Sequence, residues 1–143
     1  MSNERPMSKL TIAIPTYNRL EVLMDCLRSI QTQTMTSYEC YVIDDGSDDG
    51  TQETVRAFAN DDNRFHYIML RGGAVNGRNA GFKRAKTDIL VTFDDDVELV
   101  NPNTLAFIVQ QFERDPNLGV LGLSEYFQGD RGRDGQGTGT TDT

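Results

Sequence analysis

Short apolar runs alternate with segments of helical periodicity along most of the chain, and this alternation restricts the fold more than any other feature. The apolar runs predict strands over residues 10–14, 41–43, 65–70, 89–93 and 118–123. Between them, apolar residues recur three or four positions apart, which predicts helices over about 19–32, 51–58, 75–86 and 103–114. Pro15 is expected to end the first strand, and Asp44 the second. Unbroken apolar strands joined by helices indicate an α/β protein with a mainly parallel sheet covered on both faces.

The length of 143 residues is enough for one domain with a substantial core. Residues 1–9 are polar and are expected to be a leader, and the domain is expected to span 10–128. Residues 129–143 contain five glycines and almost no apolar side chains. Such a segment buries too little surface to offset the entropy of ordering it, so we expect a mobile tail.

The formal net charge of -8 makes nucleic acid and anionic membrane surfaces unfavourable partners. An anionic small ligand is compatible with this charge if a metal ion or local basic groups supply the opposite charge. The sequence contains no signal peptide and no apolar run of the roughly 20 residues that cross a bilayer. Cys26 and Cys40 are expected to be buried, reduced thiols. These features predict a cytoplasmic protein, and peripheral contact with a membrane stays open.

Turn-forming, polar and charged residues follow each of the first four predicted strands. Pro15, Thr16 and Tyr17 follow the first, Asp44 and Asp45 the second, Arg71 the third, and Asp94, Asp95 and Asp96 the fourth. In a parallel sheet these carboxyl ends share one edge, where open α/β sheets bind ligands. Arg78 is predicted to lie near the same edge, at the start of a helix in which Gly77 and Gly81 permit close packing on the sheet.

The stretch "VTFDDDVE" places three consecutive carboxylates at the end of a buried strand. If strand alternation continued, Asp94 and Asp96 would point to one side and Asp95 to the other. Carboxylates at such a position suit Mg²⁺ or Mn²⁺, with substrate phosphate completing the coordination shell. The alternative is a solvated acidic turn that caps the next helix.

Other catalytic patterns fit less well. An apolar run followed by Asp-x-Asp also resembles the nucleophile loop of haloacid-dehalogenase-like phosphatases, with Asp94 as nucleophile and Asp96 as acid/base. Those enzymes need a downstream lysine, and none follows Lys86. Neither a P-loop nor a Gly-x-Gly-x-x-Gly fingerprint occurs. His66, the only histidine, lies in an apolar run without a Ser-His-Asp or Cys-His system around it.

Taken together, these residues resemble family 2 glycosyltransferases, which have the GT-A fold, a Rossmann-like architecture. The matching pieces are "TIAIPTYNRLEVLMDCLRSIQTQT", "ECYVIDDGSDDGTQETVRAF", "GGAVNGRNAGFKRAKTDILVTFDDDVEL" and "LGVLGLSEYF". They occur in the family's order from about residue 10 to residue 127. The resemblance implies a metal-dependent, inverting transferase that uses a nucleoside-diphosphate sugar, with a UDP-sugar favoured, and a glycan or lipid-linked acceptor.

The resemblance also implies roles for individual residues. The acidic triplet corresponds to the family's DxD motif, in which Asp96, with Asp95 beside it, would hold Mn²⁺ or Mg²⁺, and Asp94 would contact the ribose. The other residues matched to donor binding are Pro15, Thr16 and Tyr17 around the base, Asp45 on the base, and Arg78. This chain lacks tryptophan, so the family's Gln-x-x-Arg-Trp element is absent, and no acid after the sheet stands out as the catalytic base. We therefore expect the donor-binding portion of such an enzyme; the alternative is a non-catalytic nucleotide- or metal-binding module of the same fold. The sugar, the acceptor and the oligomeric state are not identified by the sequence.

Overall fold

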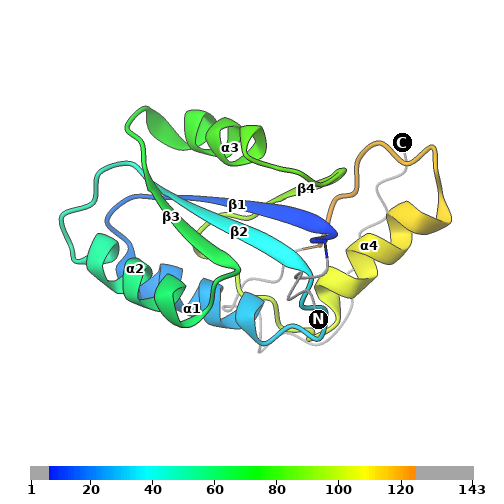
Figure 1. Cartoon of the computed structure of the whole chain (residues 1–143), viewed down its shortest axis with the longest axis horizontal. Coiled ribbons are helices and arrows are strands. Elements are labelled where there is room, and N and C mark those ends of the chain that lie inside the picture. Colours follow the sequence, from blue (N-terminus) through cyan, green and yellow to red (C-terminus); the bar gives the residue numbers. More distant parts are fainter. Residues whose placement is uncertain (1–6, 125–143) are drawn as a thin grey trace, which may run out of the picture.

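A computed structural model describes residues 7–124, in which four parallel strands form one sheet flanked by helices (Figure 1). The strands are β1 (Leu10–Thr16), β2 (Tyr38–Asp44), β3 (Phe65–Met69) and β4 (Ile89–Thr92), in the order β3-β2-β1-β4. The helices are α1 (Leu20–Gln31), α2 (Thr51–Asp61), α3 (Gly73–Lys83) and α4 (Thr104–Arg114). The predicted α/β class and parallel sheet are confirmed.

The two faces of the sheet are covered by different helices. On one face, Ile12 and Ile14 of β1 share a buried cluster with Leu27 of α1, Val55 of α2 and Leu105 of α4. On the other face lies α3, opposite α1 and α2 in Figure 1. The described residues contain no helix of the length and apolarity needed to cross a membrane.

Pro15 lies inside β1, so the prediction that it ends this strand is wrong. It pairs with Ile43 of β2, and the carbonyl of Ala13 faces the other neighbour, accepting a hydrogen bond from the amide of Phe93. Since residues two apart face the same way, Pro15 also faces that side, where pairing with β4 has already ended at Thr92. The missing amide of proline therefore costs no bond in the sheet.

The second strand also runs further than predicted, because Asp44 is its last residue and is fully buried. The carboxylate of Asp44 accepts hydrogen bonds from the backbone and hydroxyl of Ser47, at 2.9 and 2.6 Å, and from the hydroxyl of Tyr67, at 2.6 Å. These donors satisfy an acid that burial alone would penalise. The predicted break after residue 43 is therefore off by one residue, because Asp44 belongs to β2 and the strand ends there.

The fifth predicted strand is not formed: residues 118–123 carry no strand. Val120 is 87% exposed, and the segment includes Gly119 and Gly122, which weaken a strand. An apolar run indicates that a segment could enter a sheet but not that a pairing edge is available to it. The predicted helices agree in place with the observed ones, although α2 continues to Asp61 and α3 is shifted towards the N-terminus. The predicted tail, residues 129–143, lies outside the described residues, as does most of the predicted leader.

Helix α3 packs very closely on the sheet at its two interior glycines. A Cβ atom at Gly81 would lie 2.7 Å from the Cβ of Ala13, and one at Gly77 would lie 3.3 Å from the Cβ of Pro15. Real Cβ atoms essentially never approach as closely as 2.7 Å, so any larger residue at position 81 must push the helix away from β1. The glycines thus fix the height of α3 above the sheet.

The turn between α2 and β3 is held by an ion pair. The guanidinium of Arg64 donates to both carboxylate oxygens of Asp62, at 2.9 and 2.6 Å, and Gln31 donates to the same group. Arg64 also lies over the ring of Tyr38, 4.7 Å from its centroid. The hydrogen bonds from Arg64 lower the pKa of Asp62 to about 2.

Replacing Gly81 with alanine is expected to destabilise the fold by about 1–3 kcal/mol through overpacking against Ala13. The loss is expected even though alanine favours a helix interior by about 1 kcal/mol over glycine. Urea unfolding of Gly81→Ala and of Gly119→Ala, whose added Cβ would meet open space, measures the difference. Equal stability of the two variants would contradict the close packing.

The ion pair of Asp62 makes part of the stability depend on pH. Because the pKa of Asp62 is lower in the folded state, its contribution is present above about pH 4 and is lost as the pH falls towards about 2. Asp62→Asn is expected to cost about 1 kcal/mol near pH 7 and almost nothing at about pH 2. Urea unfolding at several pH values checks this, with Asp25→Asn on exposed α1 surface as the control. A loss that stays constant from pH 7 to pH 2 would refute the assignment.

Candidate functional site

The loops after the four strands meet at one edge of the sheet and are tied to one another by hydrogen bonds. The amide of Asp45 donates to the carbonyl of Thr16, and the amide of Leu70 donates to the carbonyl of Asp44. Asn18, at a φ of 48°, donates its amide to Ser47 and accepts from the amide of residue 48. The carboxyl edge is therefore a connected platform built from segments far apart in the sequence.

The three consecutive acids leave the strand in a turn. The strand ends at Thr92, and the amide of Val97 donates to the carbonyl of Asp94. The expected alternation of side chains does not persist through this turn. Instead, the guanidinium of Arg19 binds Asp95 at 2.9 Å and Asp96 at 3.2 Å, which groups these two acids.

Asp95 is the buried member of the triplet, at 5% exposure. One carboxylate oxygen accepts from the hydroxyl of Thr16 at 2.9 Å, and the other pairs with Arg19. Burial raises the pKa of Asp95, while Thr16 and Arg19 oppose that change. Because both oxygens have partners, Asp95 is suited to fix the turn rather than to be the first ligand of a metal.

Asp94 and Asp96 point towards solvent, with side chains 62% and 51% exposed. Asp94 pairs with the guanidinium of Arg78 at 2.5 Å, and Arg78 also donates to the hydroxyl of Thr92 at 3.0 Å. The structure thus brings Arg78 of α3 beside the triplet. Within residues 7–124, no group of three or more histidine, cysteine or acidic side chains is placed to hold a metal. A cation here would have one or two carboxylates and would take its remaining ligands from substrate and water.

Another acid, Asp45, lies at the platform apart from the acidic turn. Its carboxylate accepts hydrogen bonds from the amides of Gly72 and Gly73, at 2.8 and 3.4 Å. The side chain of Arg71 lies against Gly46, within about 3 Å of where a Cβ would be. Asp45 is therefore oriented by the start of α3, with a cation from the neighbouring loop close by.

Of the remaining predicted residues, Tyr17 and Pro15 lie at the same edge in different environments. Tyr17 is 54% exposed and follows the end of β1. Pro15 lies below α3, facing Gly77. The tyrosine ring is thus available to a ligand, whereas the proline supports the helix that carries Arg78.

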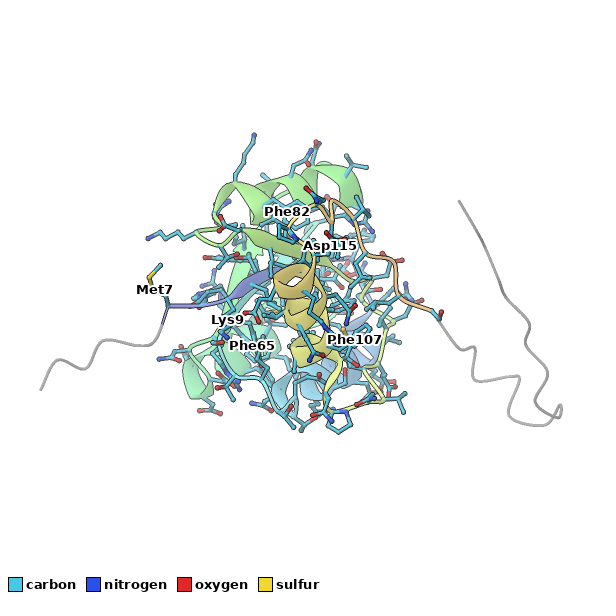
Figure 2. All side chains as sticks on the ribbon, turned by 90° about the vertical axis from the view of Figure 1, so that its right-hand side faces the viewer. Met7, Lys9, Phe65, Phe82, Phe107 and Asp115 are labelled. Carbon is cyan, nitrogen blue, oxygen red and sulfur yellow. The ribbon has the colours of Figure 1, made fainter. Side chains whose placement is uncertain are left out.

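A cleft of about 1610 Å³ adjoins the acidic turn. Arg78, Thr92, Asp94 and Asp96 line one part of it, and α4 side chains including Phe107 line another. Phe107 is 47% exposed and is labelled on α4, which faces the viewer in Figure 2. The cleft is large enough for a drug-sized or larger ligand.

Both cysteines are free and buried, as predicted. Burial, with a smaller contribution from the neighbouring acids, raises the pKa of Cys26 to about 12. A thiol of that pKa stays protonated, so Cys26 does not act as a nucleophile.

The sequence reasoning missed Arg19 and Thr92. Arg19 directly follows "PTYN", at the edge where a ligand is expected, so its place in the sequence could have identified it as a candidate site residue. Its partner Asp96 lies 77 residues further along the chain, and only the fold reveals that contact. Thr92 lies within the apolar run that predicts the fourth strand, and nothing in the sequence indicates the contact of its hydroxyl with Arg78.

The model of the family described as "Glycosyl transferase family 2" matches residues 11–141. The chain is 31% identical over 128 residues to glycosyltransferase GlyG of Streptococcus pneumoniae, covering 87% of this chain and 42% of that protein. It is 34% identical over 98 residues to the GalNAc(5)-diNAcBac-PP-undecaprenol beta-1,3-glucosyltransferase of Campylobacter jejuni, covering 66% of this chain and 32% of that protein. This chain therefore spans less than half the length of these two relatives.

Solved structures of glycosyltransferases are similar in fold. The mannosyltransferase PcManGT of Pyrobaculum calidifontis, in complex with GDP-Man and Mn²⁺, superposes with a TM-score of 0.71 at 28% identity. That match covers 79% of this chain and 34% of the other. TarS 1-349 of S. aureus in complex with UDP-GlcNAc gives a TM-score of 0.67 at 26% identity, over 74% of this chain and 31% of the other.

The contacts of Asp95 predict that Thr16 matters more for stability than another buried threonine of β1. Thr16→Val removes a hydrogen bond to a buried carboxylate and is expected to cost about 1.5–3 kcal/mol. Thr11→Val removes only a hydroxyl pair with Thr87, for which about 0.5–1.5 kcal/mol is expected. Urea unfolding measures both. Equal losses would contradict a charged, buried Asp95.

Proposed function

Since the chain belongs to glycosyl transferase family 2, we propose that its carboxyl edge binds a nucleoside-diphosphate sugar for transfer to an acceptor hydroxyl. The observation that carries this proposal is the placement of Asp96 and Asp94, two exposed carboxylates, between two arginines and a large cleft. Four loops converge there, as expected of a ligand site in an open α/β sheet. None of the relatives described above is named a phosphatase, so these relatives do not support a phospho-aspartate at Asp94.

The platform suggests a division of roles along the donor. Asp45 and the exposed ring of Tyr17 lie at the end that would receive the base, where a carboxylate can accept an N–H and a ring can stack. Asp94 would accept from the ribose hydroxyls, and Arg78, which holds Asp94, would approach the donor from α3. A UDP-sugar remains the favoured donor in this proposal; the similar structures contain GDP-Man in one case and UDP-GlcNAc in another.

The residues present fit a divalent metal ion. Asp96 has a half-exposed carboxylate, the ligand type preferred by Mg²⁺ and Mn²⁺, and Asp95 fixes the turn behind it. A bound ion would neutralise the charge that develops on the departing nucleoside diphosphate. The Mn²⁺ in the PcManGT complex supports this assignment by similarity.

The proposed reaction is an inverting displacement at the sugar's anomeric carbon. The acceptor oxygen forms a bond to that carbon as its bond to the diphosphate breaks, and a carboxylate takes the hydroxyl proton. The acids that follow the predicted sheet, Glu125, Asp130, Asp134 and Asp142, lie outside the described residues. We propose a glycan or lipid-linked acceptor, which would bring the protein to a membrane surface; the C. jejuni relative is named for an undecaprenol-linked substrate.

A second candidate is a nucleotide- or metal-binding module that does not turn over. The feature in its favour is that, in the sequence given, no acid after the predicted sheet has a context that marks it as the catalytic base. Both candidates need the same donor site. Glycosyl transfer or slow donor hydrolysis by the chain alone would exclude the module.

Nucleotide binding is expected to need both a metal and Asp96. At a hundred times its dissociation constant, a ligand adds about 2.7 kcal/mol, which raises the unfolding midpoint by several degrees. We expect this shift with UDP and Mn²⁺ together but not with UDP alone, and we expect Asp96→Asn to abolish it. A thermal-shift panel of UDP, GDP, TDP and CDP measures both effects.

Asp25→Asn, on the exposed surface of α1, is the matched control and should keep the shift. If no nucleotide stabilises the wild-type chain with metal present, the donor-site proposal fails. If Asp96→Asn binds as well as wild type, the metal assignment alone is overturned.

A further inference from the structure

We propose that Arg19 is an exchangeable counterion of the acidic turn: it occupies Asp96 when no metal is bound and gives this carboxylate up when a divalent cation binds. The inference rests on the proposed donor site, because it concerns the metal ligand assigned there. It adds a positioning residue that the sequence did not single out.

The geometry places one guanidinium across two carboxylates. The Nη1 atom of Arg19 lies 2.9 Å from Asp95 Oδ1, and Nη2 lies 3.2 Å from Asp96 Oδ2. Asp95 is buried and is also held by Thr16, whereas Asp96 is half-exposed and is bound by Arg19. The contact with Asp96 is therefore the longer and more exposed of the two, and it is the one that can open.

The position of Arg19 at the start of α1 indicates that its positive charge interacts with the neighbouring acids and does not stabilise the helix. Arg19 is the N-cap of α1 and makes no capping hydrogen bond with its side chain. A cation at a helix N-terminus opposes the helix dipole. Capping is done instead by Asp49, whose carboxylate accepts from the amide of Leu20 at 3.0 Å. What the Arg19 guanidinium does bind is Asp95 and Asp96, and the hydrogen bond with Asp96 is the largest cause of the raised pKa of Arg19.

A divalent cation and a guanidinium compete for the same carboxylate. Both are positive, so a metal at Asp96 would repel the Nη2 end of Arg19 at a few ångströms. The side chain of Arg19 is 48% exposed, which leaves room for the guanidinium to turn while its Nη1 end stays on Asp95. The released N–H donors then face the place of the donor diphosphate, where a charge-assisted hydrogen bond would offset the lost contact.

Arg78 provides the matched comparison. It pairs with Asp94, is less exposed at 30%, and is also held by the hydroxyl of Thr92. Among the described residues, the side chain of Arg78 contacts Asp94 and Thr92 and not Asp96, so the proposed exchange does not involve it. A general effect of removing positive charge would appear in both arginine variants, whereas the exchange belongs to Arg19.

The test is Mn²⁺ binding to the nucleotide-free chain, measured by calorimetry or by the EPR signal of free Mn²⁺. Arg19→Met is expected to bind Mn²⁺ about 5–20-fold more tightly than wild type, because the competing guanidinium is gone. Arg78→Met is expected to change the affinity less than about twofold at moderate salt. With Mn²⁺ saturating, UDP is expected to bind Arg19→Met more weakly than wild type, since the proposed contact with the diphosphate is lost.

Unchanged or weaker Mn²⁺ binding by Arg19→Met would overturn the proposal, because a purely structural Arg19 would give that result. Equal tightening in both variants would also overturn it. If Arg19→Met does not fold, the Nε–Hε NMR signal of Arg19 in the wild-type chain, titrated with Mg²⁺, carries the test: it should shift, and a constant signal refutes the exchange. The arms without nucleotide test Arg19, and UDP binding by wild type tests the donor site, so the two failures are distinguishable.

Discussion

The buried carboxylate of Asp95 is the interaction on which the carboxyl edge depends. It joins three segments, since Thr16 ends β1, Arg19 is the N-cap of α1, and Asp95 itself follows β4. A buried carboxylate is costly unless its oxygens are paired, and here each oxygen has a donor from a different element. This arrangement fixes the acidic turn relative to the centre of the sheet, so that Asp94 and Asp96 face solvent from a defined position.

The packing of α3 provides the other half of the site. Because Gly81 lets the helix lie directly on Ala13, the start of α3 comes low over the edge of the sheet. From there Arg78 reaches both Asp94 and Thr92, and the amides of Gly72 and Gly73 reach Asp45. The same helix therefore orients an acid at each end of the platform, and small residues in its interior make this possible.

Much of this could be predicted from the sequence, and the exceptions have physical reasons. The run at residues 10–14 is unbroken because β1 is buried in a sheet with helices on both sides. The run at 89–93 has the same pattern although β4 is an edge strand, in which Leu90 is 46% exposed. The run at 118–123 has the same pattern but no strand, since apolarity does not reveal whether a pairing edge is free. Pro15 marks a strand end in most settings, but here it lies inside β1 because it faces a side on which pairing with β4 has already ended. Arg19 is not identified from the sequence because its role depends on its contact with Asp96, which only the fold brings near.

The charges around the acidic turn help to explain how an acidic chain could bind an anionic donor. Asp94, Asp95 and Asp96 face Arg19 and Arg78, so these five side chains carry one net negative charge. In that state the edge does not attract a diphosphate. A divalent cation at Asp96 would change the sign of the local charge, although the chain as a whole remains strongly negative at -8. Metal and nucleotide would then bind as coupled ligands, each improving the site for the other, and Arg19 would limit how readily Asp96 holds a metal without its nucleotide. Both arginines offset the like-charge repulsion of the acids, and the small net charge that results is one that a single bound cation at Asp96 would reverse.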